Sequence, residues 1–253
     1  MFGICNLSVI SLRKEASDRS EMVSQVLFGE HFTIIETNKQ WYKIHVHFDN
    51  YEGWIDAKQI KIITTAEFNH LNDCWPEYNI DLVAHVADQN NYLLPITIGS
   101  AVNFLSIATL NTEKLNFEGL KISGKQPKNN IIETSFLYLN APYLWGGKTP
   151  FGIDCSGFTQ MVYKINGYSL LRDASQQAGQ GEVLSFIEEC EPGDLAFFDN
   201  DDGKIIHVGI VLEHNYIIHA SGKIRIDRLD HSGIFNEDTK MHTHKLRLLK
   251  RYI

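Results

Sequence analysis

Short runs of alternating apolar and polar residues fill the first quarter of the chain. Trp41-Tyr-Lys-Ile-His-Val46 alternates with period two, which is the pattern of a strand with one buried face. Phe28-Gly29-Glu30 and Asp49-Asn50 separate such runs, because glycine, asparagine and aspartate favour turns. The spacing predicts a small β-barrel over residues 1–65.

A second copy of this pattern follows the first. Asn50-Tyr-Glu-Gly-Trp54 has a counterpart in Asn116-Phe-Glu-Gly-Leu120, and the turn at Gly29 has one at Gly99. Two matches at similar offsets predict a degenerate second barrel over residues 80–125. Chance similarity is the alternative explanation.

Two further segments define the remaining boundaries. Residues 66–79, between the two copies, are expected to form a helical linker. Ser123-Gly-Lys-Gln-Pro-Lys-Asn-Asn130 is polar and contains glycine and proline, which is typical of a domain boundary. We therefore expect the last domain over residues 126–253.

The periodicity changes to helical at Cys155, directly after a loop rich in glycine and proline. Phe158, Val162 and Ile165 recur at helical spacing, so Cys155 is expected to open a helix. The free N–H groups at a helix start favour a thiolate and can hold an oxyanion. Cys155 is thus a candidate nucleophile, and a buried structural cysteine is the alternative.

Two histidines lie on consecutive apolar strands downstream. If the hairpin turns about Glu213, His207 and His219 face each other directly on one side of the sheet. His207 could then take the proton of Cys155, while His219 fixes its tautomer. The pattern predicts attack by sulfur on a carbonyl carbon and hydrolysis of an acyl-enzyme.

Composition narrows the range of functions. The 253 residues are 43% apolar and 21% charged, as in ordinary soluble proteins. A net charge of −8 argues against nucleic acid or an anionic membrane as partner. No segment approaches the roughly 18 uninterrupted apolar residues of a spanning helix. The first residues lack a basic region before an apolar one, so we expect a cytoplasmic protein, or an envelope protein if a leader was removed.

Metal and cofactor motifs are not expected. The four cysteines form no CxxC pair, which argues against a zinc site and is consistent with free thiols. His231, His242 and His244 lack converging cysteines or carboxylates. We expect these three side chains on a solvated surface, with no metal and no cofactor in the protein.

Five motifs resemble the NlpC family of papain-like cell-wall cysteine peptidases, over roughly residues 128–253. They are Tyr143-Leu-Trp-Gly-Gly147, Asp154-Cys-Ser-Gly-Phe158, Pro192-Gly-Asp-Leu195, His207-Val-Gly-Ile210 and His219-Ala220. Near the N-terminus, the Gly29 turn and Tyr51-Glu-Gly-Trp-Ile55 resemble a bacterial SH3-like domain. The resemblance implies an α+β fold: a helix bearing the cysteine, packed on an antiparallel sheet bearing both histidines, after one or two SH3-like barrels.

The resemblance also implies roles for individual residues. Cys155 is the nucleophile, His207 the base and His219 the orienting partner. The substrate cleft is lined by Tyr143, Asp154, Ser156 and Ser175.

Glu21 and Tyr51 are the residues that we expect to read a free substrate amine. A carboxylate and an aromatic ring together compensate an ammonium group that leaves water. Tyr51 is alternatively a core aromatic of the barrel, and Glu21 alternatively a solvated turn residue.

The combination of domains is similar to γ-D-glutamyl-L-diamino acid endopeptidases, which cleave after γ-linked D-glutamate in murein stem peptides. The expected substrate is L-Ala-γ-D-Glu-diamino acid with a free N-terminus, as in murein peptide recycling. The diamino acid is meso-diaminopimelate or lysine. A secreted autolysin that cuts intact peptidoglycan and a non-catalytic murein-binding protein are the alternatives.

Overall fold

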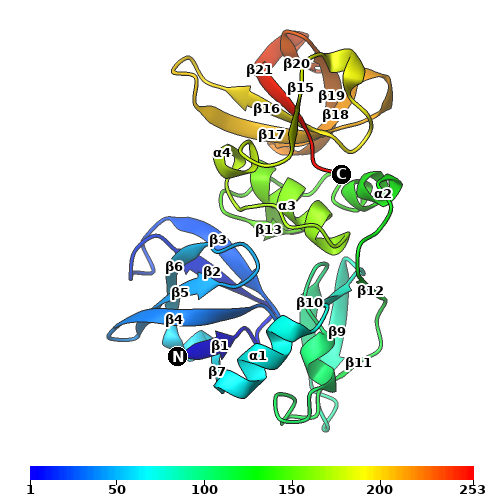
Figure 1. Ribbon diagram of the computed structural model, residues 1–253. Helices are drawn as coiled ribbons and strands as arrows, with labels where there is room; N and C mark the ends of the chain where they lie inside the picture. Colours follow the sequence, from blue (N-terminus) through cyan, green and yellow to red (C-terminus); the bar gives the residue numbers. More distant parts are fainter. The chain divides into compact units, whose positions relative to one another are not determined.

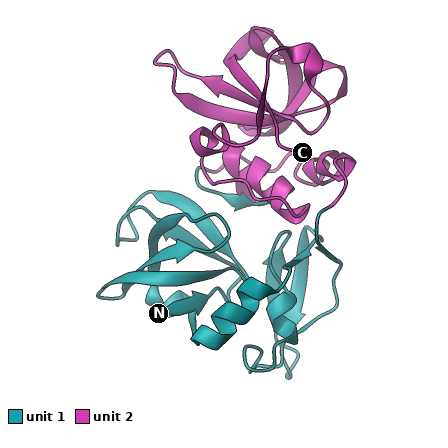
Figure 2. Ribbon diagram, viewed as in Figure 1, with its two compact units in different colours: residues 1–125, 145–150 teal, residues 126–144, 151–253 magenta.

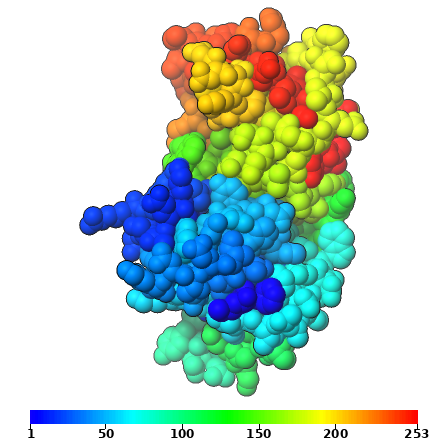
Figure 3. Space-filling view, turned by 60° about the vertical axis from the view of Figure 1, so that its left-hand side comes forward, coloured from blue at the N-terminus to red at the C-terminus, as the bar shows by residue number.

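The computed structural model describes all 253 residues and divides into two compact units (Figure 2). Unit 1 comprises residues 1–125 and 145–150, and unit 2 comprises residues 126–144 and 151–253. The first residues lie at the surface of unit 1, where Met1 is exposed (Figure 3). No helix combines the length and apolar character needed to cross a bilayer.

Unit 1 begins with a strongly bent antiparallel sheet (Figure 1). Its order is β3-β2-β6-β5-β4-β1-β7, and alternate residues of its strands face a core that includes Ile10, Phe32 and Ile44. Asp56 caps the short η1 (Ala57–Gln59) through its side chain. The strands are β1 (Phe2–Ile4), β2 (Val9–Arg13), β3 (Met22–Leu27), β4 (His31–Asn38), β5 (Trp41–Val46), β6 (Glu52–Asp56) and β7 (Lys61–Ile63).

A helix and a second group of strands complete the first 125 residues. Helix α1 (Thr65–Asp73) starts at a capping box formed by Thr64 and Glu67. Strand β9 pairs with β10 and β11, and β8 pairs with β12. The remaining elements are β8 (Glu77–Asn79), β9 (Val83–Ala87), β10 (Leu93–Thr97), η2 (Asn103–Ser106), β11 (Asn116–Phe117) and β12 (Lys121–Ser123).

The turns at Gly29 and Gly99 have the same backbone geometry. Both glycines have a φ of +81°, and each donates its N–H over 2.8 Å, to the carbonyls of Cys5 and Asn79 respectively. The two turns meet where the Ala101 N–H donates to the Phe28 carbonyl. A Cβ on Gly29 would lie 1.9 Å from the carbonyl oxygen of Ala101, so only glycine fits there.

Residues 145–150, which include β13 (Lys148–Thr149), fold with unit 1 rather than with their sequence neighbours. The Lys148 ammonium lies 3.1 Å from the Glu30 carboxylate, and both side chains are buried. The Lys148 N–H donates to Gln25, and the Trp145 indole N–H donates to Glu21. These bonds hold the segment against the barrel, whereas the sequence suggested that residues 126–253 are continuous.

Unit 2 is built on a buried helix and a nearly closed sheet. Helix α3 is buried along its whole length and packs against β17, β18 and α2. The sheet order is β15-β21-β16-β17-β18-β19-β20, and β20 also pairs with β21, so six strands close on themselves. The cysteine lies on the helix and both histidines lie on the sheet, which confirms the predicted α+β fold class.

The elements of unit 2 have the following bounds. Helices and turns are α2 (Asn129–Leu137), α3 (Cys155–Ile165), α4 (Ala174–Gln177), η3 (Ile187–Glu189) and η4 (Glu213–Asn215). Strands are β14 (Gly152–Ile153), β15 (Glu182–Leu184), β16 (Leu195–Asp199), β17 (Ile205–Val211), β18 (Tyr216–Ser221), β19 (Lys223–Asp230), β20 (Gly233–Asn236) and β21 (Met241–Arg251).

We predict that Gly29→Ala destabilises the protein much more than Gly124→Ala. Both glycines have positive φ, which costs other residues about 1–2 kcal/mol. Only Gly29 lacks room for a methyl group, because nothing lies within 4 Å of the Cβ position at Gly124. Urea unfolding of the two variants measures the difference. Equal losses would show that the Gly29 turn adapts.

Candidate active site

Cys155 is the first residue of α3, as the sequence predicts. Asp154 is the N-cap, and its Oδ1 accepts the Gly157 N–H over 2.6 Å. Cys155 itself is buried against β17, where its sulfur is hydrogen-bonded to the backbone of Val208. The helix start therefore places the sulfur next to the strand that carries His207.

Arg172 binds the carboxylate of Asp154, the N-cap of α3, and this role was not predicted from the sequence. Its guanidinium donates to both oxygens of Asp154, at 3.0 and 2.7 Å, and to the Ser156 hydroxyl at 2.9 Å. Arg172 and Asp154 are both buried. A buried carboxylate requires a cation or several donors. The sequence indicates that Asp154, if buried, requires a cationic partner, but it does not indicate which arginine is that partner.

The residues expected to line the substrate cleft divide into two groups. Ser156 and Asp154 flank Cys155 in sequence. Tyr143 lies close enough to Cys155 and Asp154 for electrostatic interaction with both. Burial, followed by Cys155 and Asp154, raises the pKa of the Tyr143 hydroxyl to about 12. Ser175 is exposed on α4. A substrate contact by Ser175 stays a prediction.

The two histidines meet diagonally rather than directly across the hairpin. Gly209 is the register partner of His219, so the predicted pairing of His207 with His219 was wrong by two residues. The hairpin turns about His214 instead of Glu213, since the Leu212 N–H donates to the Tyr216 carbonyl and His214 and Asn215 adopt positive φ within η4. An even shift keeps both histidines on one face.

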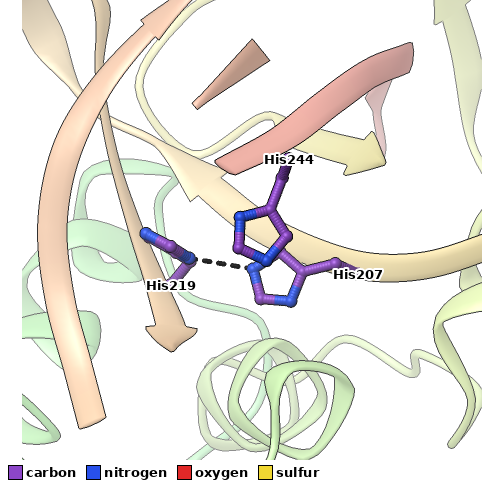
Figure 4. A group of neighbouring side chains, drawn as sticks. All are labelled: His207, His219 and His244. Carbon is purple, nitrogen blue, oxygen red and sulfur yellow. Dashed lines mark hydrogen bonds between the residues drawn. The ribbon is translucent and has the colours of Figure 1, made fainter. Parts of the chain in front are cut away.

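The predicted contact between the two imidazoles is confirmed. His207 Nε2 lies 2.8 Å from His219 Nδ1 (Figure 4). Gly209 provides the space for this diagonal contact, because a Cβ there would lie 2.9 Å from the Cβ of His219.

Asp227 extends the chain of hydrogen bonds and was not identified from the sequence. Its Oδ2 lies 3.0 Å from His219 Nε2, and Arg225 donates to both carboxylate oxygens. Burial alone would raise the pKa of Asp227, but hydrogen bonds from His219 and Arg225 lower it below its usual value. Asp227 is therefore a charged acceptor inside the protein.

The charge on Asp227 determines the tautomers of both histidines. A carboxylate only accepts, so His219 carries its proton on Nε2 and presents the Nδ1 lone pair to His207. His207 then carries its proton on Nε2, which leaves the lone pair on Nδ1. This is the protonation state that a general base needs.

The resting cysteine and histidine are both neutral. Burial, followed by the charge of Asp154, raises the pKa of the Cys155 thiol to about 12. Burial, followed by His219 and His244, lowers the pKa of His207 well below its usual value. Backbone hydrogen bonds from Val208 and from Ser156, at the helix start, lower the pKa of the thiol as expected, but burial outweighs them. Reaction requires proton transfer from sulfur to imidazole.

A third histidine joins the pair. His244, on β21, stacks on His207 with ring centroids 4.2 Å apart and 25° between the planes (Figure 4). Burial lowers the pKa of His244 to about 4. The expectation of a solvated His244 is therefore wrong, since strand pairing around the closed sheet brings β21 to this site. His231 and His242 are exposed, as expected.

Glu21 and Tyr51 have clear contacts within unit 1. A Glu21 carboxylate oxygen accepts the Trp145 indole N–H over 2.8 Å. Tyr51 is partly buried against the core of the first barrel. Their proposed reading of a substrate amine stays a prediction.

Comparison with known families identifies both regions. Residues 140–243 match the NlpC/P60 family, and residues 12–60 match a bacterial dipeptidyl-peptidase SH3 domain. The C-terminal domain is an NlpC/P60 domain. All of the residues placed around Cys155 and His207, except His244, lie within the matched range.

Curated relatives match this chain over most of their own length. The γ-D-glutamyl-L-lysine dipeptidyl-peptidase of Bacillus subtilis is 28% identical over 221 residues, 78% of this chain and 71% of that protein. Dipeptidyl-peptidase 6 of Lysinibacillus sphaericus is 26% identical over 257 residues, 91% of this chain and 92% of that protein.

A solved structure supports the fold along the entire chain. An NlpC/P60 family protein from Bacillus cereus matches with a TM-score of 0.81 and 20% identity. The match covers 100% of this chain and 99% of that one.

We predict that Asp227→Asn lowers kcat by about 10–100-fold, the usual effect of losing a partner that orients a functional imidazole. An amide can donate to His219 and so stabilise the wrong tautomer. Steady-state kinetics should show a smaller change in KM. Asp230→Asn is the matched control, because Asp230 lies on the same strand but pairs with the exposed His242. Equal kcat values for Asp227→Asn and the wild type would contradict the assignment.

The pH profile provides an independent prediction. His207 must be neutral to accept a proton, and its pKa lies well below 6.5. Activity should therefore be retained as the pH falls through 6.5 and be lost only in more acidic solution. The profile of kcat/KM from about pH 4 to about pH 8 measures this limb. An acidic limb centred above 6.5 would show that His207 is not held neutral by burial.

Proposed function

We propose that the chain is a cysteine peptidase that hydrolyses the bond after γ-linked D-glutamate in murein peptides. The observation that carries the proposal is the hydrogen-bond chain from Asp227 through His219 to His207. It leaves the Nδ1 lone pair of His207 free on the strand next to Cys155. Cysteine peptidase activity requires a base of this kind beside the thiol.

The mechanism follows from these positions. His207 Nδ1 accepts the thiol proton, and the resulting imidazolium is stabilised by His219 and the charge of Asp227. The thiolate attacks the carbonyl carbon while a backbone N–H at the start of α3 stabilises the oxyanion. His207 returns the proton to the leaving amine. Water, deprotonated by His207, then releases the acyl group as a carboxylate.

The substrate assignment rests on the curated relatives. Two Bacillus proteins of this arrangement are named γ-D-glutamyl-L-lysine dipeptidyl-peptidases. For the present chain we propose L-Ala-γ-D-Glu-diamino acid peptides with a free N-terminus, released as a dipeptide and a diamino acid. We include a cytoplasmic role in murein peptide recycling in this proposal, and cell fractionation tests it.

We predict that the purified protein releases L-Ala-γ-D-Glu from L-Ala-γ-D-Glu-L-Lys, and that Cys155→Ala abolishes this release. Mass spectrometry identifies both products. Cys190→Ala is the matched control, because Cys190 is a half-buried free thiol whose charged neighbours are Asp194, Arg251, Glu189 and Lys128. Hydrolysis that persists in Cys155→Ala would overturn the proposal.

The N-acetylated peptide tests the requirement for a free amine. Equal hydrolysis of both peptides would contradict that requirement while leaving the peptidase assignment intact. Preferential release from intact peptidoglycan would instead support an autolysin.

A further inference from the structure

Three histidines converge at one end of the closed sheet, and the proposed reaction uses two of them. His207, His219 and His244 each offer a ring nitrogen, and these atoms all lie within 4.8 Å of one another. They come from three strands, β17, β18 and β21. Figure 4 shows the His244 ring overlapping the His207 ring, on which it stacks, beside the hydrogen bond between His207 and His219.

Two of the imidazoles already have the partners that metal-binding histidines use. A histidine ligand usually donates its second N–H to a carboxylate, carbonyl or hydroxyl group. His219 Nε2 is bonded to Asp227, which leaves Nδ1 as the lone-pair atom facing the cluster. His244 Nδ1 lies 2.9 Å from the Thr243 hydroxyl, which itself donates to the Ile234 carbonyl. The Thr243 oxygen can thus accept from His244 Nδ1, which leaves Nε2 as the lone-pair atom.

We propose that this cluster, His207, His219 and His244, binds a divalent ion of the Zn²⁺ type. Three imidazole nitrogens with an open fourth position suit Zn²⁺, which prefers four-coordinate nitrogen and sulfur sites. Two nitrogens bound to one tetrahedral ion at about 2.1 Å lie about 3.4 Å apart. The 2.8 Å pair needs to open slightly, and the partly exposed His244 ring needs to turn toward it.

Metal binding would inhibit the peptidase, and this consequence rests on the proposed function. His207 Nε2 can hold the ion only in the tautomer that carries its proton on Nδ1. The ion also replaces the hydrogen bond from His207 to His219. His207 then lacks the arrangement needed to accept the thiol proton, so Zn²⁺ competes with catalysis rather than assisting it.

Direct binding measurements test the site without a substrate, so failure of the peptidase assignment would not affect them. Calorimetric titration of the full chain with Zn²⁺ should give one ion per chain. His244→Ala should weaken binding by at least about tenfold, since even partners outside the metal's ligands change affinity by about 10–100-fold. His244→Gln should behave in the same way while keeping a polar side chain of similar size. Unfolding curves check that both variants fold.

Two further variants distinguish the cluster from other sites. His242→Ala is the matched control, because His242 lies on the same strand and points to Asp230 instead; its affinity should equal that of the wild type. Cys155→Ala should still bind the ion, whereas loss of binding would show a simple cysteine–histidine site. Co²⁺ should give visible bands of four-coordinate geometry in the wild type. Unchanged Zn²⁺ affinity in His244→Ala would overturn the proposal.

Discussion

The buried charge of Asp227 determines the tautomers of His219 and His207. A carboxylate enclosed by protein cannot donate a proton, so the direction of each hydrogen bond from it is fixed. His219 transmits that direction to His207 across strands that are neighbours in the sheet. Arg225 keeps Asp227 ionised by donating to both of its oxygens. The proposed base, His207, is therefore already in the tautomer that it needs before any substrate binds.

A second buried ion pair acts on the cysteine side. Arg172 and Asp154 form a two-point contact that holds the first turn of α3. A buried pair of this kind rarely adds net stability, because removing two charges from water is costly. Its value here is geometric. The carboxylate caps the helix and, by its charge, disfavours a thiolate on the neighbouring residue until the histidine accepts the proton.

The sequence predicts those parts of the site that depend on local structure. Helix periodicity after Cys155 locates the proposed nucleophile, and strand alternation puts His207 and His219 on one face. The register was displaced by two residues because the hairpin turns about His214, inside η4, where residues adopt positive φ that no hydrophobic pattern reveals. Asp227 could have been found from the Ser221-Gly222 turn. A tight hairpin there pairs His219 with Arg225 across the two strands, and Asp227, two residues further on, lies on the same face as Arg225. Arg172 and His244 could not, because their contacts depend on how distant segments pack.

Residues 145–150 affect how the protein can be divided. They interrupt the sequence of unit 2 yet donate hydrogen bonds to Glu21, Gln25 and Glu30 of unit 1. The chain therefore passes between the units three times. A truncated protein beginning at residue 126 would keep these six residues without the groups that order them, directly upstream of Cys155. Exchange of the N-terminal barrel between homologues would likewise have to carry this segment with it, although the segment is encoded 20 residues beyond the end of the barrel region at residue 125.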